Sequence, residues 1–236
     1  MDRSRALTGV GNRRGSSAAL AALGLLLAGC GQTITGSAVP DRVAPPHRLD
    51  ARLSDLLLPP SAFPAPYRAI VLEPHAVAQA AGDLAGIPPG AKADPAGCKP
   101  AQVDSSPDGT AIVVGTDEDT RATITVELKR SDQQLAQRRA QLQQCPDVRS
   151  THHGVTSQVH SELLPAPVVD ADDALAVRQT VRSGTVVTLT QSMLTLVAQR
   201  DDVRISATYM AFDSRRPDTA ALDEVFTAAV QRVAEA

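Results

Sequence analysis

Residues 174–212 read ALAVRQTVRSGTVVTLTQSMLTLVAQRDDVRISATYMAF. Apolar and polar residues alternate one by one from Val203 to Tyr209, which is the period of a strand with one buried face. Tight turns at Ser183-Gly184 and at 200–202 separate three such strands, expected over 174–182, 185–198 and 202–212. Because hairpins this short force antiparallel pairing, the stretch predicts an antiparallel sheet.

Strands and helices are expected on both sides of this stretch. Three further strands are expected over 110–116, 121–129 and 155–164. Helices are predicted over 74–85, 132–145 and 218–235, and the apolar residues of the last recur at helical spacing. The sequence therefore predicts an α+β fold: an antiparallel sheet of about six strands with flanking helices and a C-terminal helix packed on one face.

The first 30 residues have the pattern of an export signal. Four arginines precede an apolar run at 18–28, AALAALGLLLA, which is too short to span a bilayer. The run ends Leu27-Ala28-Gly29-Cys30, which resembles a bacterial lipobox: small residues precede the cut, and the thiol after it carries the diacylglyceryl group. We expect a lipoprotein signal peptide over 1–29, cleaved between Gly29 and Cys30. The alternative is a plain signal peptide with a chance cysteine, and the export route stays open.

The remaining chain divides into a tether and one domain. Residues 30–52, beginning with the lipidated Cys30, are small, polar and rich in proline, which predicts a flexible tether of about 25–30 Å. Residues 53–236 are long enough for a single extracytoplasmic domain. We expect acyl chains to anchor it at the outer, extracytoplasmic face of the cell membrane.

Charge and composition narrow the possible partners. Loss of residues 1–29 removes four Arg and one Asp, so the formal charge of −3 becomes about −6. Only 2% of the residues are aromatic. An acidic surface that is poor in aromatic side chains attracts neither nucleic acid nor anionic head groups, so no nucleic-acid partner is expected.

Two cysteines remain after Cys30. In an oxidising compartment the default expectation is a disulfide between Cys98 and Cys145, which would hold the proline- and glycine-rich segment 86–109 on the domain. A reactive thiol pair or a metal site is the alternative, but the spacing contains no C-x-x-C motif. We expect no cofactor.

Few residues suggest catalysis. His152-His153 with His160 could hold a metal ion, but a solvated loop is the stronger interpretation. The acidic runs 117–119 and 170–173 lack the ligand spacing of a calcium loop and suit solvated turns. The sequence has no G-x-S-x-G, H-E-x-x-H or phosphate-binding loop, so it predicts a protein without enzymatic activity and without a metal site.

The aliphatic composition favours one kind of ligand. A pocket in this chain would be lined by Val, Leu, Ile and Ala, which suits a small apolar or lipid ligand, although these residues equally form an ordinary core. The ligand-binding residues are not predicted. The alternatives are a module that docks an envelope protein through its sheet face or segment 86–109, and, less favoured, an envelope hydrolase.

Several segments together resemble a known group of proteins. The lipobox, the tether sequence Thr33-Ile34-Thr35-Gly36, the run LLLPPSAFP at 56–64 and the cysteine after a proline-rich stretch resemble actinobacterial cell-envelope lipoproteins. They are also similar to the extracellular sensor domain of mycobacterial protein kinase H. The resemblance implies an antiparallel sheet with flanking helices and a cleft for an unknown ligand, and it brings no catalytic residues. That domain has two disulfides, whereas Cys98 and Cys145 allow only one.

Overall fold

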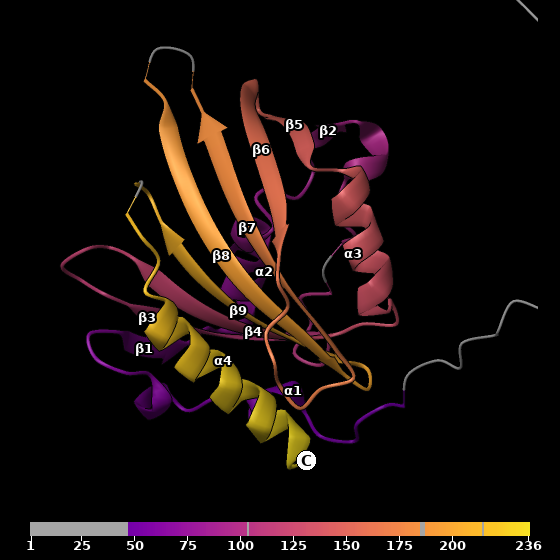
Figure 1. The fold of residues 1–236 in the computed structure, drawn as a ribbon, viewed down its shortest axis with the longest axis vertical. Helices are drawn as coiled ribbons and strands as arrows, with labels where there is room; N and C mark the ends of the chain where they lie inside the picture. Colours follow the sequence, from indigo (N-terminus) through magenta and orange to yellow (C-terminus); the bar gives the residue numbers. More distant parts are fainter. Residues whose placement is uncertain (1–46, 103, 185–186, 214) are drawn as a thin grey trace, which may run out of the picture. The chain divides into compact units, whose positions relative to one another are not determined.

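A nine-stranded antiparallel sheet organises the structure (Figure 1). The computed structural model describes residues 47–102, 104–184, 187–213 and 215–236. The expected signal peptide, Cys30 and the tether as far as residue 46 lie outside these residues. The strands follow the order β1-β3-β4-β9-β8-β7-β6-β5-β2, and every neighbouring pair is antiparallel.

All six expected strands are present, but the expected number was wrong. The six are β3 (Thr110–Thr116), β4 (Thr123–Arg130), β6 (Val155–Leu164), β7 (Asp173–Ser183), β8 (Leu189–Arg200) and β9 (Val203–Ala211). The three additional strands are β1 (Arg68–Val71), β2 (Lys92–Asp94) and β5 (Asp147–His152). Two of these are edge strands of three or four residues, and β5 contains one buried apolar residue, Val148. Main-chain hydrogen bonds to a neighbouring strand keep these segments in the sheet. Because such bonds do not depend on apolar side chains, the sequence of these segments shows no hydrophobic periodicity.

The three predicted helices are confirmed. They are α2 (Pro74–Leu84), α3 (Leu135–Gln144) and α4 (Thr219–Ala234), and a short helix α1 (Leu53–Leu56) precedes them. Gly86, with φ of +69°, follows the end of α2 in a conformation that glycine adopts readily. The carboxylate of Asp218 accepts a hydrogen bond from Ala221 N and so caps the start of α4. Among the described residues, no helix is both long enough and apolar enough to cross a membrane.

The two faces of the sheet are covered by different helices. Helix α4 packs on β9, β8 and β4, on the front in Figure 1, whereas α2 lies behind the sheet against β3 and α3 packs on β6 and β7. We call the α4 side the helix-covered face and the other side, which carries α2 and α3, the groove face. The predicted packing of the C-terminal helix on one face is confirmed.

The main core lies on the helix-covered face. Strand residues such as Ile124, Val126, Leu128 and Ile205 meet the apolar side of α4 there, and Phe226 of α4 is only 1% exposed. Burial of large side chains of this kind contributes about 1.5–3 kcal/mol each. The helix-covered face therefore supplies most of the hydrophobic stabilisation of the fold.

A buried aspartate attaches the segment before α1 to the sheet. Asp202, in the β8–β9 turn, forms an ion pair with Arg130 at 2.7 Å, and its carboxylate accepts a hydrogen bond from Leu49 N. Asp202 N donates to His47 O, and Arg130 also donates to Ala51 O. Residues 47–52, expected at the end of the tether, are thus bonded to the domain, so the packed part of the chain begins before residue 53.

Candidate functional site

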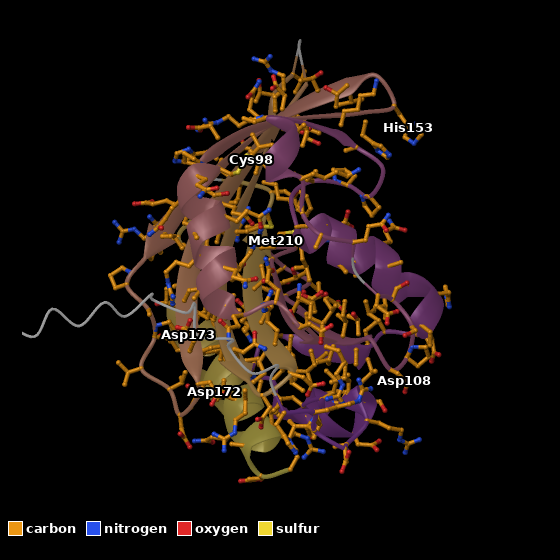
Figure 2. The ribbon with its side chains drawn as sticks, turned by 90° about the vertical axis from the view of Figure 1, so that its right-hand side faces the viewer. Cys98, Asp108, His153, Asp172, Asp173 and Met210 are labelled. Atoms are coloured by element: carbon orange, nitrogen blue, oxygen red, sulfur yellow. A yellow bond between two sulfur atoms is a disulfide. The ribbon has the colours of Figure 1, made fainter. Side chains whose placement is uncertain are left out.

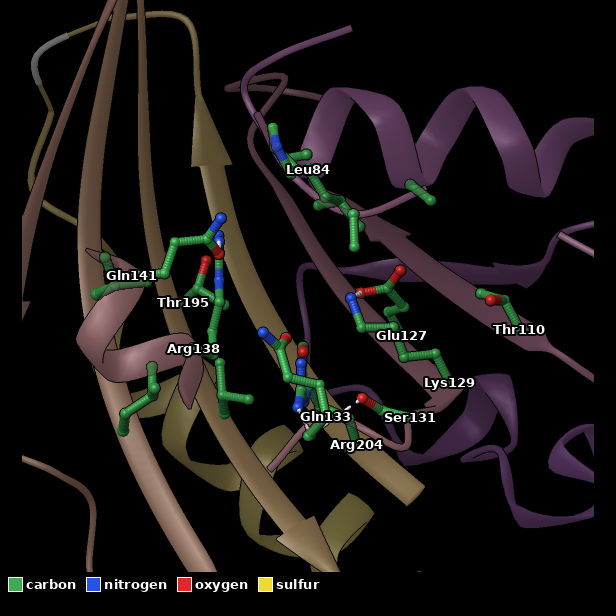
Figure 3. Close-up of a pocket in the computed structure, with 18 of the residues that line it drawn as sticks. Leu84, Thr110, Glu127, Lys129, Ser131, Gln133, Arg138, Gln141, Thr195 and Arg204 are labelled. Atoms are coloured by element: carbon green, nitrogen blue, oxygen red, sulfur yellow. Dashed lines mark hydrogen bonds and ion pairs between the residues drawn. The ribbon is translucent and has the colours of Figure 1, made fainter. Parts of the chain in front are cut away.

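A groove of about 570 Å³ lies on the groove face between α2 and α3 (Figure 3). Its floor is formed by β4, β9, β8 and β7, and its two walls come from α2 with segment 100–102 and from α3 with the loop before it. The pairing register places one row of residues across this floor: Leu175, Val197, Ser206, Glu127 and Ile112. The ends of the row are apolar because α3 and α2 cover them, and the middle is polar.

The expected aliphatic lining is wrong for the centre of the groove. The central strands place polar side chains there, namely Glu127, Lys129, Arg204, Ser206, Thr208, Thr195 and Gln179. These residues occupy the positions that alternate with the apolar residues of the helix-covered face. Because α2 and α3 rise on both sides, several of them are buried rather than solvated; Thr208, for example, is 2% exposed.

An acidic and a basic side chain on β4 form a pair in the groove. Glu127 and Lys129 are two residues apart and therefore share a face of the strand, with 3.5 Å between carboxylate and ammonium (Figure 3). The Glu127 side chain is 7% exposed. The nearby Lys129 therefore partly neutralises this buried carboxylate.

Arg204 is a buried cation opposite Lys129. The two residues face each other across β4 and β9, and Arg204 is 6% exposed. Its guanidinium donates to the side-chain oxygen of Gln199 at 3.2 and 3.1 Å and to the main-chain oxygen of Gln133. The pKa of Arg204 is lowered to about 10, chiefly by burial and also by nearby Arg138, while Glu127 opposes the change. Arg204 thus keeps its charge at neutral pH.

Arg138 brings a second guanidinium to the groove from α3. It donates to the side-chain oxygen of Gln141 on the same helix at 2.7 Å, and burial lowers its pKa. Arg138 lies in the first turn of α3. Figure 3 shows Arg138 and Gln141 on the side of the groove opposite Glu127. The two arginines therefore belong to one charged cluster built from a strand and a helix.

A second, more apolar cavity adjoins the groove. It measures about 290 Å³ and shares Ala81, Ala85 and residues 100–102 with the groove. Its other lining residues are small or apolar, including Ala78, Gly82, Ile87 and the prolines that follow α2, apart from Lys99. We call this cavity the apolar annex. A ligand in the groove can extend an apolar part into it.

The predicted disulfide between Cys98 and Cys145 is present, with 5.6 Å between the two Cα atoms. Cys98 ends the 3₁₀ turn η2 (Ala96–Cys98) that precedes the 100–102 wall, and Cys145 follows the last residue of α3. The bond therefore joins the segments that form the two opposite walls of the groove. An ion pair from Arg139 to Asp173 at 2.7 Å further holds α3 on β7.

The histidines are not brought together. His152 and His153 lie at the β5–β6 turn with ring centroids 4.0 Å apart, and Figure 2 shows His153 projecting at the tip of this hairpin. His160 pairs in register with Asp147 at the other end of the hairpin, and its ring bonds to that carboxylate at 2.7 Å. In the part of the chain that the structure describes, no cluster of three or more potential ligands for a metal ion is found.

The acidic runs are turn residues. Asp117 accepts hydrogen bonds from Asp119 N and from the Thr120 hydroxyl in the β3–β4 turn; these bonds, chiefly that from Thr120, lower its pKa. Asp172 accepts from Asp201 N at 2.7 Å and so links two neighbouring turns. Figure 2 shows Asp172 and Asp173 far from His153, toward the opposite end of the molecule. Asp117 and Asp172 thus serve the turns in which they occur, whereas Asp173 begins β7 and pairs with Arg139 of α3.

Sequence reasoning missed the two groove arginines, for different reasons. Arg204 occupies a polar position in the clean alternation of β9, a pattern that predicts exposure rather than burial. The one signal that it carried is a cation on the same strand face as Ser206 and Thr208. Arg138 lies in a helix with only two buried residues, Leu135 and Leu142, so no periodicity distinguishes it from its neighbour Arg139.

Comparison with known proteins gives structural neighbours alone. No family model matches the chain, and no curated protein matches it. It is similar to a solved structure of an uncharacterised Mycobacterium smegmatis protein, the Rv0999 ortholog, at 18% identity and a TM-score of 0.43, over 73% of this chain and 92% of that one. It is also similar to the extracellular domain of PknH from Mycobacterium tuberculosis, at 10% identity and a TM-score of 0.45, over 81% and 98%. At these values no function is carried over to this chain.

Proposed function

We propose that this protein is a membrane-anchored, extracytoplasmic binding protein without enzymatic activity, which takes a small ligand in the groove between α2 and α3. The observation that carries the proposal is the groove itself: about 570 Å³, within the usual size of ligand sites, with buried polar side chains on its floor. Surface depressions without a ligand rarely contain so many buried polar groups, because each is costly to desolvate.

The lining changes the expected ligand from apolar to amphipathic. The polar floor around Glu127 and Arg204 suits a head group that forms hydrogen bonds, and the apolar annex suits a hydrocarbon part. A lipid or lipid-like molecule has both parts. The absence of enzymatic activity remains part of the proposal: the one buried carboxylate of the floor, Glu127, is paired with Lys129.

Native mass spectrometry tests the binding. The full chain with Cys30→Ser, exported so that no acyl chain is attached, is incubated with an envelope lipid extract and measured without detergent. We expect a bound mass of lipid size. Gln137→Trp, whose side chain lines the groove, should remove it, whereas Ala140→Trp, exposed on the same helix and away from the lining, should keep it. A bare mass in every sample contradicts the proposal.

Detergent-phase partition tests the anchor. The full chain made in an actinobacterial host should enter the detergent phase of a Triton X-114 extract, because two or more acyl chains give stable membrane attachment. Cys30→Ser should move it to the aqueous phase. Equal partition of the two proteins contradicts lipidation at Cys30.

One observation favours the second candidate, a module that docks an envelope protein. Four large apolar side chains are exposed at the same end of the sheet: Val155 (55%), Val187 (70%), Leu189 (69%) and Phe212 (67%). Exposed apolar patches often mark protein interfaces. Replacement of Leu189 and Phe212 by serine should then prevent recovery of a cross-linked partner, while groove variants should not affect it.

A further inference from the structure

Three arginines line the groove; Arg130 is paired with Asp202, whereas Arg138 and Arg204 bond only to neutral oxygens. Arg204 donates to Gln199 and Gln133, and Arg138 donates to Gln141. Among the described residues, no carboxylate lies within 4.0 Å of either guanidinium. Nη1 of Arg204, and Nε and Nη2 of Arg138, have no hydrogen-bond acceptor in the described chain, so donors remain for a ligand.

The fixed charges of the groove leave an excess of positive charge on the α3 side. Lys129 and Arg204 face each other directly across two strands, an arrangement that is unfavourable without an anion between or beside them. Glu127 supplies one negative charge and is already paired with Lys129. The other carboxylates of the lining, Asp104 and Asp132, are exposed, and Asp104 accepts a hydrogen bond from Ser106 N. The buried Arg204 and the partly exposed Arg138 are therefore not paired with any carboxylate of the described chain.

The geometry of guanidinium selects the kind of anion. Its planar fork of N–H donors matches the two oxygens of a carboxylate or a phosphate, and such bonds are stronger than bonds between neutral groups. The apolar annex adjoins the groove through the shared wall at residues 100–102. An anionic head at the arginines can thus continue into an alkyl chain in the annex.

We propose that the groove recognises an organic anion, a carboxylate or phosphate carrying an apolar chain, through Arg138 and Arg204. This inference rests on the proposed function and specifies the ligand chemistry of the same groove. The anion has two possible sources, the head group of an envelope lipid or a small free anion. Both present the same oxygens to the arginines and differ in whether the annex is filled.

Calorimetric titration with four defined probes tests the inference on the exported full chain with Cys30→Ser. Decanoate and decyl phosphate carry both head and chain, decanol carries the chain alone, and inorganic phosphate carries the head alone. We expect the two alkyl anions to bind at least about tenfold more tightly than decanol, because a hydrogen bond to a charged group contributes about a factor of ten or more to affinity. Binding of inorganic phosphate at similar affinity identifies a free anion as the source, and its failure to bind identifies a lipid.

Matched variants assign the binding to the two arginines. Arg138→Gln and Arg204→Gln should each weaken decanoate binding about tenfold or more, and Arg204→Lys should recover part of the loss because it keeps the charge but not the fork. Arg182→Gln removes an equal charge from an exposed position on β7 outside the groove lining and should leave affinity unchanged. If Arg204→Gln does not fold, Arg138→Gln still tests whether a groove arginine binds the anion, because Arg138 occupies a partly exposed position on α3.

The outcomes separate this inference from the proposed function. Decanol binding as tight as that of decanoate, or binding that neither arginine variant weakens, overturns the inference. If that binding is still blocked by Gln137→Trp, the groove remains a ligand site and the proposed function stands. If no probe binds and the lipid extract also leaves a bare mass, both fail.

Discussion

The two faces of one sheet have opposite chemistry in this protein. On the helix-covered face, β4 and β9 present Ile124, Val126, Ile205 and Ala207 to α4, and these residues are fully buried. On the groove face, the alternate positions of the same strands present Glu127, Arg204 and hydroxyl residues to a groove. The same backbone thus carries a hydrophobic core on one side and a charged cluster on the other.

This difference separates stability from binding. Burial of apolar surface stabilises the folded state, whereas a buried cation such as Arg204 is costly, and under the proposed function an anionic ligand would offset that cost. The helix-covered face therefore should respond to substitutions mainly through the free energy of unfolding. The groove face should respond mainly through ligand affinity.

The largest expected effect comes from placing the same charge on each face. Val225→Asp, on the buried side of α4, should cost more than about 5 kcal/mol or abolish folding, because the new carboxylate has no partner. Thr195→Asp, in the groove, should cost about 1 kcal/mol, close to the loss of its hydrogen bond to Thr208. Urea unfolding measures both. Equal costs would remove the distinction between the faces.

Loss of the disulfide should come next. The combined change Cys98→Ser and Cys145→Ser opens a loop whose ends have a sequence separation of 47, which by the loop-entropy model costs about 4 kcal/mol. Because the bond joins the two groove walls, affinity for decanoate should also fall. Unfolding and titration of the same variant check both. Unchanged affinity would show that the walls keep their spacing without the bond.

A smaller loss is expected where the segment 47–52 meets the sheet. Asp202→Asn removes the charge that pairs with partly buried Arg130 and should cost about 3 kcal/mol. Because Asp202 also accepts from Leu49 N and positions Arg130, which donates to Ala51 O, weaker attachment of this segment should speed proteolysis before α1. The matched change Asp201→Asn, in the same turn, should have little effect. Equal cleavage of the Asp202→Asn variant and the wild-type chain would contradict this role.

The smallest effect should depend on pH. Hydrogen bonding to Arg139 lowers the pKa of Asp173, so this pair stabilises the fold above the unfolded value of 3.8 and loses its effect as the pH falls through the lower folded value. Because the two side chains are 33% and 34% exposed, Arg139→Gln should cost only about 0.5–1 kcal/mol at pH 7. Unfolding at pH 7 and pH 3 measures the change. A cost that does not shrink at pH 3 would show that the ion pair is not its source.

The sequence predicted the helix-covered face better than the groove face, and the reason is physical. Alternation along β9 and helical spacing along α4 both report apolar burial, so these elements and their contact could be predicted. The same alternation assigns Arg204 to solvent, because the pattern does not reveal that α2 and α3 cover the other face. The disulfide could be predicted from the compartment and the count of cysteines, but its place between the two walls could not.

The three additional strands show a second limit. β1, β2 and β5 are held by main-chain hydrogen bonds to β3, β5 and β6, and their side chains carry little apolar signal. The edge strands β1 and β2 pair with neighbours distant in sequence, whereas β5 adjoins β6 through the turn at His153-Gly154. For this reason the central six strands could be predicted and the width of the sheet could not.

The most direct test of the central claim is a map of amide chemical shifts on the exported full chain with Cys30→Ser, titrated with decanoate. We predict changes confined to the groove: around residues 204–208 of β9, residues 127–129 of β4 and residues 137–141 of α3, with the amides of α4 unaffected. Changes that gather instead around Val155, Leu189 and Phe212, or no changes at all, would contradict the assignment of the groove as the binding face.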